Sequence, residues 1–186
     1  MAPLAGVSVA GRVGCGRVGF DVAVLFTHRG LSGPAILQAS SYWREGEAVV
    51  LDLVPEGDPL AVLLAGKAGR PNAALRTVLG EMLPARLAAA LAAGDMPMAQ
   101  QRDRALGELA ARLRAWRLVP SGSEGHAKAE VTLGGIATAG LSQQTMMARA
   151  VPGLFAIGEA VDVTGWLGGY NFQWAWSSGW CAGMAV

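Results

Sequence analysis

The sequence is short of the residues that build cross-linked, metal-binding or highly charged proteins. Its 186 residues include two cysteines, Cys15 and Cys181, and two histidines. Two widely separated thiols exclude a disulfide framework or a zinc knuckle and fit a reducing compartment, so we expect a cytoplasmic protein without a metal. Charged residues make up 16% of the chain, and the net charge is +1. Because binding to nucleic acid or an anionic membrane through charge needs a more basic chain, we expect neither partner.

Other signals are missing as well. No apolar run is long enough to span a bilayer, and the N-terminus lacks the charged region and apolar run of a signal peptide. The sequence contains neither a metal-binding H-E-x-x-H motif nor the G-x-S-x-G turn of a serine hydrolase. The chain is nevertheless 52% apolar, which argues against disorder.

Glycine is the abundant residue, with 26 copies, about twice average usage. Changes in residue pattern along the chain predict three domains: a β-rich subdomain over residues 1–57, a helical subdomain over 58–117 and a mixed segment over 118–186. We expect strands at 7–9, 20–26, 48–54, 116–119, 128–133 and 154–157, and helices over 33–43, within 58–116 and from Asn171 onward. The fold class that follows is α/β for the family described below and α+β within this chain.

One glycine motif is misleading. Residues Gly14 to Gly19 read G-x-G-x-x-G, the form of a dinucleotide-binding turn, which works only between a strand and a helix. Here the next residues, 20–26, have a strand pattern. We therefore interpret the motif as a β-hairpin turn.

The C-terminal third has a more informative pattern. A short apolar segment ends in Gly158 and Glu159, and Gly168-Gly169 precede the last helix. Glycine allows close backbone approach to a ligand, and a carboxylate at a strand end suits the hydroxyl groups of a sugar or ribityl chain. With Asn171 as its predicted N-cap, the last helix offers free amides to partial negative charge.

At this point the sequence resembles the BaiN-like (YhiN-like) flavoproteins. The matching stretches are 26–35, 131–136, 145–147, 157–159 and 168–176. The resemblance implies a Rossmann-like FAD-binding domain interrupted by a β and helical insert, of which this chain resembles the central and C-terminal parts without the N-terminal Rossmann half.

The resemblance also implies a function and a site. It implies an FAD-dependent oxidoreductase with a small-molecule substrate and NAD(P)H as candidate reductant; the oligomeric state is not indicated. His28 and Arg29 are the candidates for the substrate side. The residues that fall where such proteins touch FAD are Gly158, Glu159, Asp162, Gly168, Gly169, Tyr170, Asn171 and Phe172.

Two other functions stay open. The chain could be a truncated, non-catalytic remnant or binding module without flavin. It could also be an RNA-binding helical module, because arginines gather at 102, 104, 112, 114 and 117. A solvated helix face is the favoured interpretation of these arginines, since no aromatic platform beyond Trp116 is interleaved with them.

Overall fold

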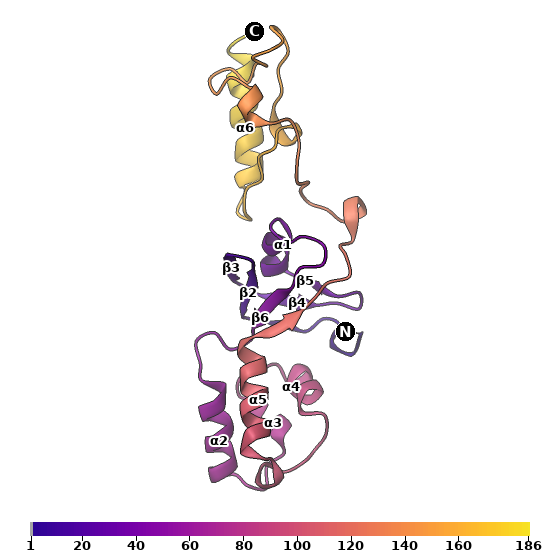
Figure 1. Cartoon of the computed structure of the whole chain (residues 1–186), viewed down its shortest axis with the longest axis vertical. Coiled ribbons are helices and arrows are strands. Elements are labelled where there is room, and N and C mark those ends of the chain that lie inside the picture. The colour runs from indigo at the N-terminus through magenta and orange to yellow at the C-terminus, as the bar shows by residue number, and fades with distance from the viewer. Residues whose placement is uncertain (1) are drawn as a thin grey trace. The chain divides into compact units, whose positions relative to one another are not determined.

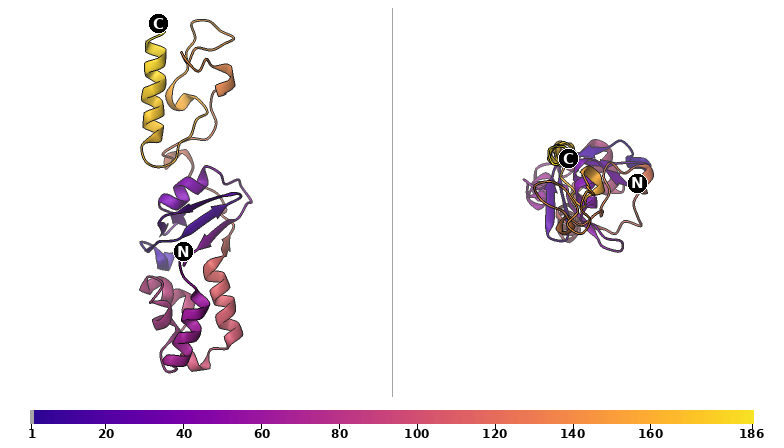
Figure 2. Two further views of the ribbon diagram at one scale, coloured as in Figure 1. Left: turned by 90° about the vertical axis from the view of Figure 1, so that its left-hand side faces the viewer. Right: turned by 90° about the horizontal axis from the view of Figure 1, so that it is seen from above.

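The computed structural model describes residues 2–186, which form two compact units, one ending at Ser121 and one running from Gly122 to Val186 (Figures 1 and 2). Each unit is described by itself below. The finer division at residues 57 and 117 remains a prediction.

The first unit contains two antiparallel sheets. A three-stranded sheet has the order β1-β4-β5, and a four-stranded sheet has the order β3-β2-β6-β7. Together with the helices these sheets make a mixed α+β fold, which confirms the fold class expected for this chain. The strands are β1 (Ser8–Val9), β2 (Arg12–Cys15), β3 (Val18–Asp21), β4 (Val24–Phe26), β5 (Leu31–Ser32), β6 (Val49–Asp52) and β7 (Trp116–Leu118).

The G-x-G-x-x-G motif is a β-hairpin, as predicted. Strands β2 and β3 pair with Gly14 opposite Gly19, and Gly16 sits in the turn with a φ of 57°. A positive φ is the conformation that glycine adopts without steric cost. Because β3 begins within the motif, the motif presents no helix N-terminus to a pyrophosphate. The single strand predicted over 20–26 is divided in the structure: β3 ends at Asp21 and β4 begins at Val24.

Helix α1 (Pro34–Ser40) is shorter than the predicted 33–43. Gly33 is its N-cap, with a φ of 88°, and a Cβ there would lie 2.9 Å from the backbone nitrogen of Leu25. Close packing against β4 therefore fixes where the helix begins.

The helical part of the first unit contains α2 (Pro59–Gly69), α3 (Leu75–Leu79), α4 (Ala85–Ala92) and α5 (Asp103–Arg114), with short 3-10 turns at Ala2–Leu4 and Met98–Gln100. Asp58 caps α2 as expected, because its carboxylate accepts hydrogen bonds from the backbone N–H groups of Leu60 and Ala61 at 3.0 and 3.1 Å. Apolar residues on the inner faces of these helices pack against the sheets. Val13, Leu51, Leu63 and Leu113 are buried members of one continuous core.

The second unit has little regular structure. Its elements are the 3-10 turns η3 (Gly125–Ala127), η4 (Thr138–Gly140) and η5 (Gly158–Ala160), and helix α6 (Tyr170–Gly183). The strands predicted at 128–133 and 154–157 are wrong. The second segment forms only an isolated bridge between Met147 and Phe155, because neither segment has a neighbouring strand to pair with along its length. Within residues 2–186, no helix is both long and apolar enough to cross a membrane.

Candidate functional site

The turn at Gly158 is attached to helix α6. Its N–H donates to Ser178 Oγ at 3.0 Å, and its carbonyl accepts from the indole Nε1 of Trp174 at 2.9 Å. The φ of 60° at Gly158 is a left-handed conformation, which explains why glycine occupies this position. Both backbone polar groups of Gly158 are therefore used inside the unit, and its role in the structure is to hold the turn on the helix.

Ser178 was not predicted from the sequence. It is 2% exposed, and its hydroxyl also donates to the carbonyl of Trp174 at 2.7 Å. A serine inside a helix commonly bonds its own backbone in this way, so no sequence signal distinguished it. Only the fold shows that the same oxygen accepts the N–H of Gly158.

A second segment approaches the same turn. The backbone of Ile136 exchanges two hydrogen bonds with residues around Val161: it donates to the carbonyl of Ala160 at 2.8 Å and accepts from Asp162 at 2.9 Å. A Cβ on Gly135 would lie 2.8 Å from that same Ala160 oxygen. Gly135 thus allows this strand-like segment to lie against η5.

The loop before α6 is closed by a side chain. Asn171 accepts from the N–H of Gly165 at 2.7 Å and donates to its carbonyl at 3.1 Å. The expectation that Asn171 is the N-cap is wrong: Gly169 is the N-cap, with a φ of 88°, and α6 begins at Tyr170. Asn171 lies inside the first turn and faces back across the loop.

The open polar groups at this site are few. The first backbone N–H groups of any helix have no partner within the helix, and those of α6 follow Gly168 and Gly169. A Cβ on Gly169 would meet nothing within 4 Å. Glu159 and Asp162 have exposed side chains. The second unit therefore presents helix amides, which can bind a partly negative ligand edge, and exposed carboxylates, which can bind hydroxyl groups.

Helix α6 also presents an exposed aromatic face. Phe172, Trp176 and Trp180 follow one another at four-residue spacing and are 76%, 78% and 72% exposed. Tyr170 is exposed too, at 63%. Large exposed apolar patches mark interaction surfaces or ligand sites, so this face is the strongest binding feature of the second unit.

His28 and Arg29 lie in the first unit, in the turn between β4 and β5, and both are exposed. The hydroxyl of Thr27 accepts hydrogen bonds from the N–H groups of Arg29 and Gly30 at 3.2 and 3.0 Å. This bonding shapes the turn through its backbone. The two candidate groups of the sequence analysis, the turn at 28–29 and the glycine loop, therefore belong to different units.

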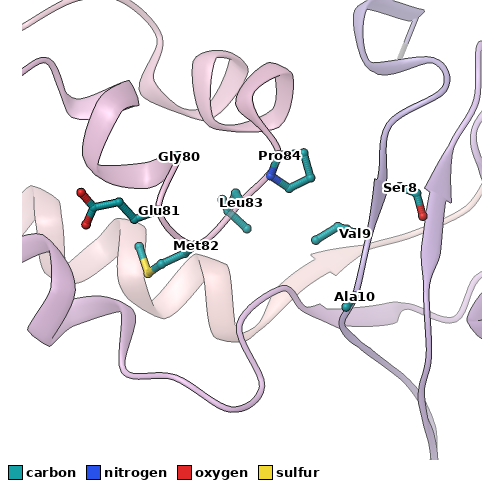
Figure 3. Close-up of a pocket in the computed structure, with 8 residues that line it drawn as sticks. All are labelled: Ser8, Val9, Ala10, Gly80, Glu81, Met82, Leu83 and Pro84. Carbon is teal, nitrogen blue, oxygen red and sulfur yellow. The ribbon is translucent and has the colours of Figure 1, made fainter.

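Other features of the described chain offer less chemistry. Within residues 2–186, no group of three or more His, Cys, Asp or Glu side chains could hold a metal ion. A pocket of about 340 Å³ lies between β1 and the α3–α4 turn, with Ser8 on one side and Glu81 on the other (Figure 3). The carboxylate of Glu81 is already paired with Arg70.

The model of the HI0933-like protein barrel and H2TH domain matches residues 1–131. The chain belongs to this family. The match covers the two sheets and the helices of the first unit.

Two curated relatives match over more of the chain. The ribosomal RNA dihydrouridine synthase of Escherichia coli is 51% identical over 168 residues, which is 88% of this chain and 42% of that protein. The Haemophilus influenzae protein of the same name is 42% identical over 92% of this chain and 44% of its own length. The 3-dehydro-bile acid delta(4,6)-reductase of Clostridium scindens is 42% identical over 64 residues, 34% of this chain. The chain thus spans less than half the length of each relative.

These relatives overturn one expectation. We expected a small-molecule substrate and no nucleic acid as a partner, but the two proteins that match most of the chain are named for ribosomal RNA. The net charge of the whole chain conceals an uneven distribution of charge. Thirteen of fifteen basic residues and ten of fourteen acidic residues precede residue 122, which gives the first unit a net charge of +3 and the second a net charge of −2.

Proposed function

We propose that this chain is part of an FAD-dependent oxidoreductase that reduces uridine to dihydrouridine in ribosomal RNA. The observation that carries the proposal is the 51% identity, over 88% of the chain, to the Escherichia coli enzyme of that name. The resemblance of the sequence motifs to BaiN-like flavoproteins supports FAD as the cofactor. Dihydrouridine differs from uridine by two hydrogens across one carbon–carbon double bond, so the reaction needs a hydride and a proton. Reduced flavin, when bound, would supply the hydride.

The residues at the glycine loop fit a flavin. The space beside Gly169 is free within 4 Å of a built Cβ, and the first amides of α6 follow it. We propose that these amides, at Gly169, Tyr170, Asn171 and Phe172, face the flavin ring edge, where a helix N-terminus stabilises negative charge by about 0.3–2 kcal/mol. The Asn171 bridge to Gly165 supports this loop from behind.

The remaining candidates have separate proposed roles. Glu159 and Asp162, both exposed, would accept hydrogen bonds from ribityl or ribose hydroxyls. Gly158 would act through position, because its own polar groups are already bonded to Ser178 and Trp174. Gly168 would let the loop reach the flavin. His28 and Arg29, exposed on the β4–β5 turn, are proposed as substrate contacts, and NAD(P)H as the source of electrons.

A chimera tests this function. The matching segment of the Escherichia coli enzyme is replaced by this chain, and the chimera is expressed in cells that lack the native enzyme. We expect mass spectrometry of nucleosides from purified ribosomal RNA to detect dihydrouridine at the level of wild-type cells, and the purified chimera to carry FAD. A matched chimera with Gly169→Val should lose FAD. A yellow chimera that forms no dihydrouridine would refute the RNA substrate, and a stable chimera without flavin would favour the non-catalytic alternative.

A further inference from the structure

The outward face of the four-stranded sheet in the first unit carries few side chains. Alternate residues of its strands, such as Val13, Cys15, Phe20 and Leu51, point into the core and are buried. Their neighbours must point the other way. This outward face is formed by Arg12, Gly14, Gly19, Asp21, Val50, Asp52 and Arg117.

One row of this face crosses all four strands. Gly19 on β3 is opposite Gly14 on β2, Gly14 is opposite Val50 on β6, and Val50 is opposite Arg117 on β7. The row therefore has two glycines at one end and an exposed arginine at the other. Figure 1 shows β3, β2 and β6 side by side.

Within the first unit, a Cβ on Gly14 would have room. The atoms nearest to it would belong to Val50 and Val18, at 3.8–4.0 Å, on the adjacent strands. Its φ is not positive, so the backbone does not require glycine either. A glycine inside a strand weakens the strand, and its presence often marks a place where a ligand or another backbone comes close.

Gly19 has a different explanation. A Cβ on it would lie 2.6 Å from the guanidinium of Arg12, which crosses this position to pair with Asp21. A side chain at position 19 would therefore displace the Arg12 guanidinium from its present place beside Asp21. The contrast leaves Gly14 as the glycine that the fold itself does not explain.

Both carboxylates of the face are already paired with arginines. Arg12 is neutralised by Asp21, and Asp52 is paired with Arg114 from the end of α5. Arg117 on the face and Arg17 in the adjoining hairpin turn are both exposed, and neither forms an ion pair among residues 2–186. Two guanidinium groups thus remain for an anionic partner.

We propose that this outward face binds the sugar–phosphate backbone of RNA, an inference that rests on the proposed function. A guanidinium matches a phosphate with two parallel hydrogen bonds. Strands β7 and β2 are two positions apart in the sheet, so Arg117 and Gly14 are separated by roughly 10 Å. Arg117 can therefore bind a phosphate while a neighbouring ribose lies against the backbone at Gly14. A protein partner fits less well, because Val50 is the one apolar side chain of the face and stable protein interfaces need larger apolar anchors.

Direct titration tests the face. The 186-residue chain is titrated with a fluorescein-labelled RNA stem–loop and with protein-free bacterial ribosomal RNA, over a range of salt concentrations. We expect Arg117→Glu to weaken binding about tenfold and to reduce the slope of log affinity against log salt by about one. Gly14→Val suits a strand and should weaken binding about tenfold by blocking close approach, with unchanged urea unfolding.

Arg102→Glu is the matched control. Arg102 is exposed, forms no ion pair among the described residues, and precedes α5, whereas Arg117 follows it, about 18 Å of helix away. This control should bind RNA as the wild type does. Equal weakening by Arg102→Glu and Arg117→Glu would show that only net charge matters and overturn the proposal. Wild-type affinity in Gly14→Val and Arg117→Glu, or no RNA binding by the unmodified chain, would also overturn it.

The outcomes separate this proposal from the proposed function. A chimera that forms no dihydrouridine, together with a chain that binds RNA through Gly14 and Arg117, removes the enzymatic assignment and keeps the surface. A working chimera with variants that bind RNA normally removes the surface and keeps the enzyme.

Discussion

The two units differ in how far they bury their apolar side chains. In the first unit, apolar side chains from both sheets and all its α-helices form one core, and that core cluster contains no residue beyond Leu113. In the second unit, the buried apolar residues are Leu141, Met146, Val161 and Ala182. Many large apolar residues of this unit are instead exposed, including Leu154, Trp166, Phe172, Trp176 and Trp180.

The comparison shows that apolar content alone does not determine a core. Helix α5 has a buried stripe, Leu106, Ala110 and Leu113, and charged residues on its other side. Helix α6 has aromatic residues on the side that its own unit leaves open. A helix that is apolar on most sides is normally buried in a larger protein, and a large exposed apolar patch is uncommon on a solvated surface.

The largest effect that separates the units should come from core truncation. Leu113 is fully buried, and Leu113→Ala should lower the free energy of unfolding of the first unit by about 2–5 kcal/mol, because it leaves a cavity. Urea unfolding followed by circular dichroism measures this change. Leu154→Ala in the second unit is the matched control: Leu154 is 54% exposed, and its truncation should change stability by less than about 0.5 kcal/mol. Equal losses would contradict the contrast.

The two cysteines give a second comparison, one in each unit. Burial raises the pKa of the Cys15 thiol, and the nearby Glu47 carboxylate raises it further, while Arg44 opposes both. Cys181 is half-buried in α6. Because the thiolate is the reactive form, iodoacetamide should alkylate Cys181 at least about tenfold faster than Cys15 in the folded chain. Peptide mass spectrometry measures both rates, and concentrated urea should make them similar.

The raised pKa also predicts a pH effect. The neutral thiol of Cys15 is favoured in the folded state, so its contribution to stability is complete below the ordinary thiol pKa. As the pH rises, the unfolded thiol ionises first, and the contribution is lost as the pH approaches the folded-state value. Cys15→Ser should remove this alkaline loss. If the wild type and the serine variant lose stability in parallel at alkaline pH, the Cys15 thiol is not responsible.

Local rules explain what the sequence predicted. The hairpin at Gly14–Gly19 and the Asp58 cap depend on neighbouring residues, and both are present in the structure. The wrong elements, the strands at 128–133 and 154–157, depend on partners far along the chain. At the candidate site, the glycine positions were recognisable from their pattern, whereas Ser178, the Asn171 bridge and the Arg12 crossing of Gly19 arise from tertiary contacts that no local pattern encodes. The site residues themselves stay predictions.

The smallest of these destabilising effects should come from the hydrogen bond that holds the Gly158 turn on α6. Ser178→Ala removes the acceptor that bonds the N–H of Gly158 at 3.0 Å, and a lost hydrogen bond of this kind costs about 0.5–1.5 kcal/mol. The loss of stability should stay within the second unit, because the Ser178 hydroxyl forms its hydrogen bonds with Gly158, Trp174 and Ala175. Hydrogen exchange should therefore speed up at the Gly158 amide and leave the amides of Val13 and Leu51 unchanged. Ser178→Thr keeps an oxygen acceptor and should preserve slow exchange at Gly158. Faster exchange in the first unit would show that the two units unfold together, and unchanged exchange at Gly158 would show that Ser178 does not hold the turn.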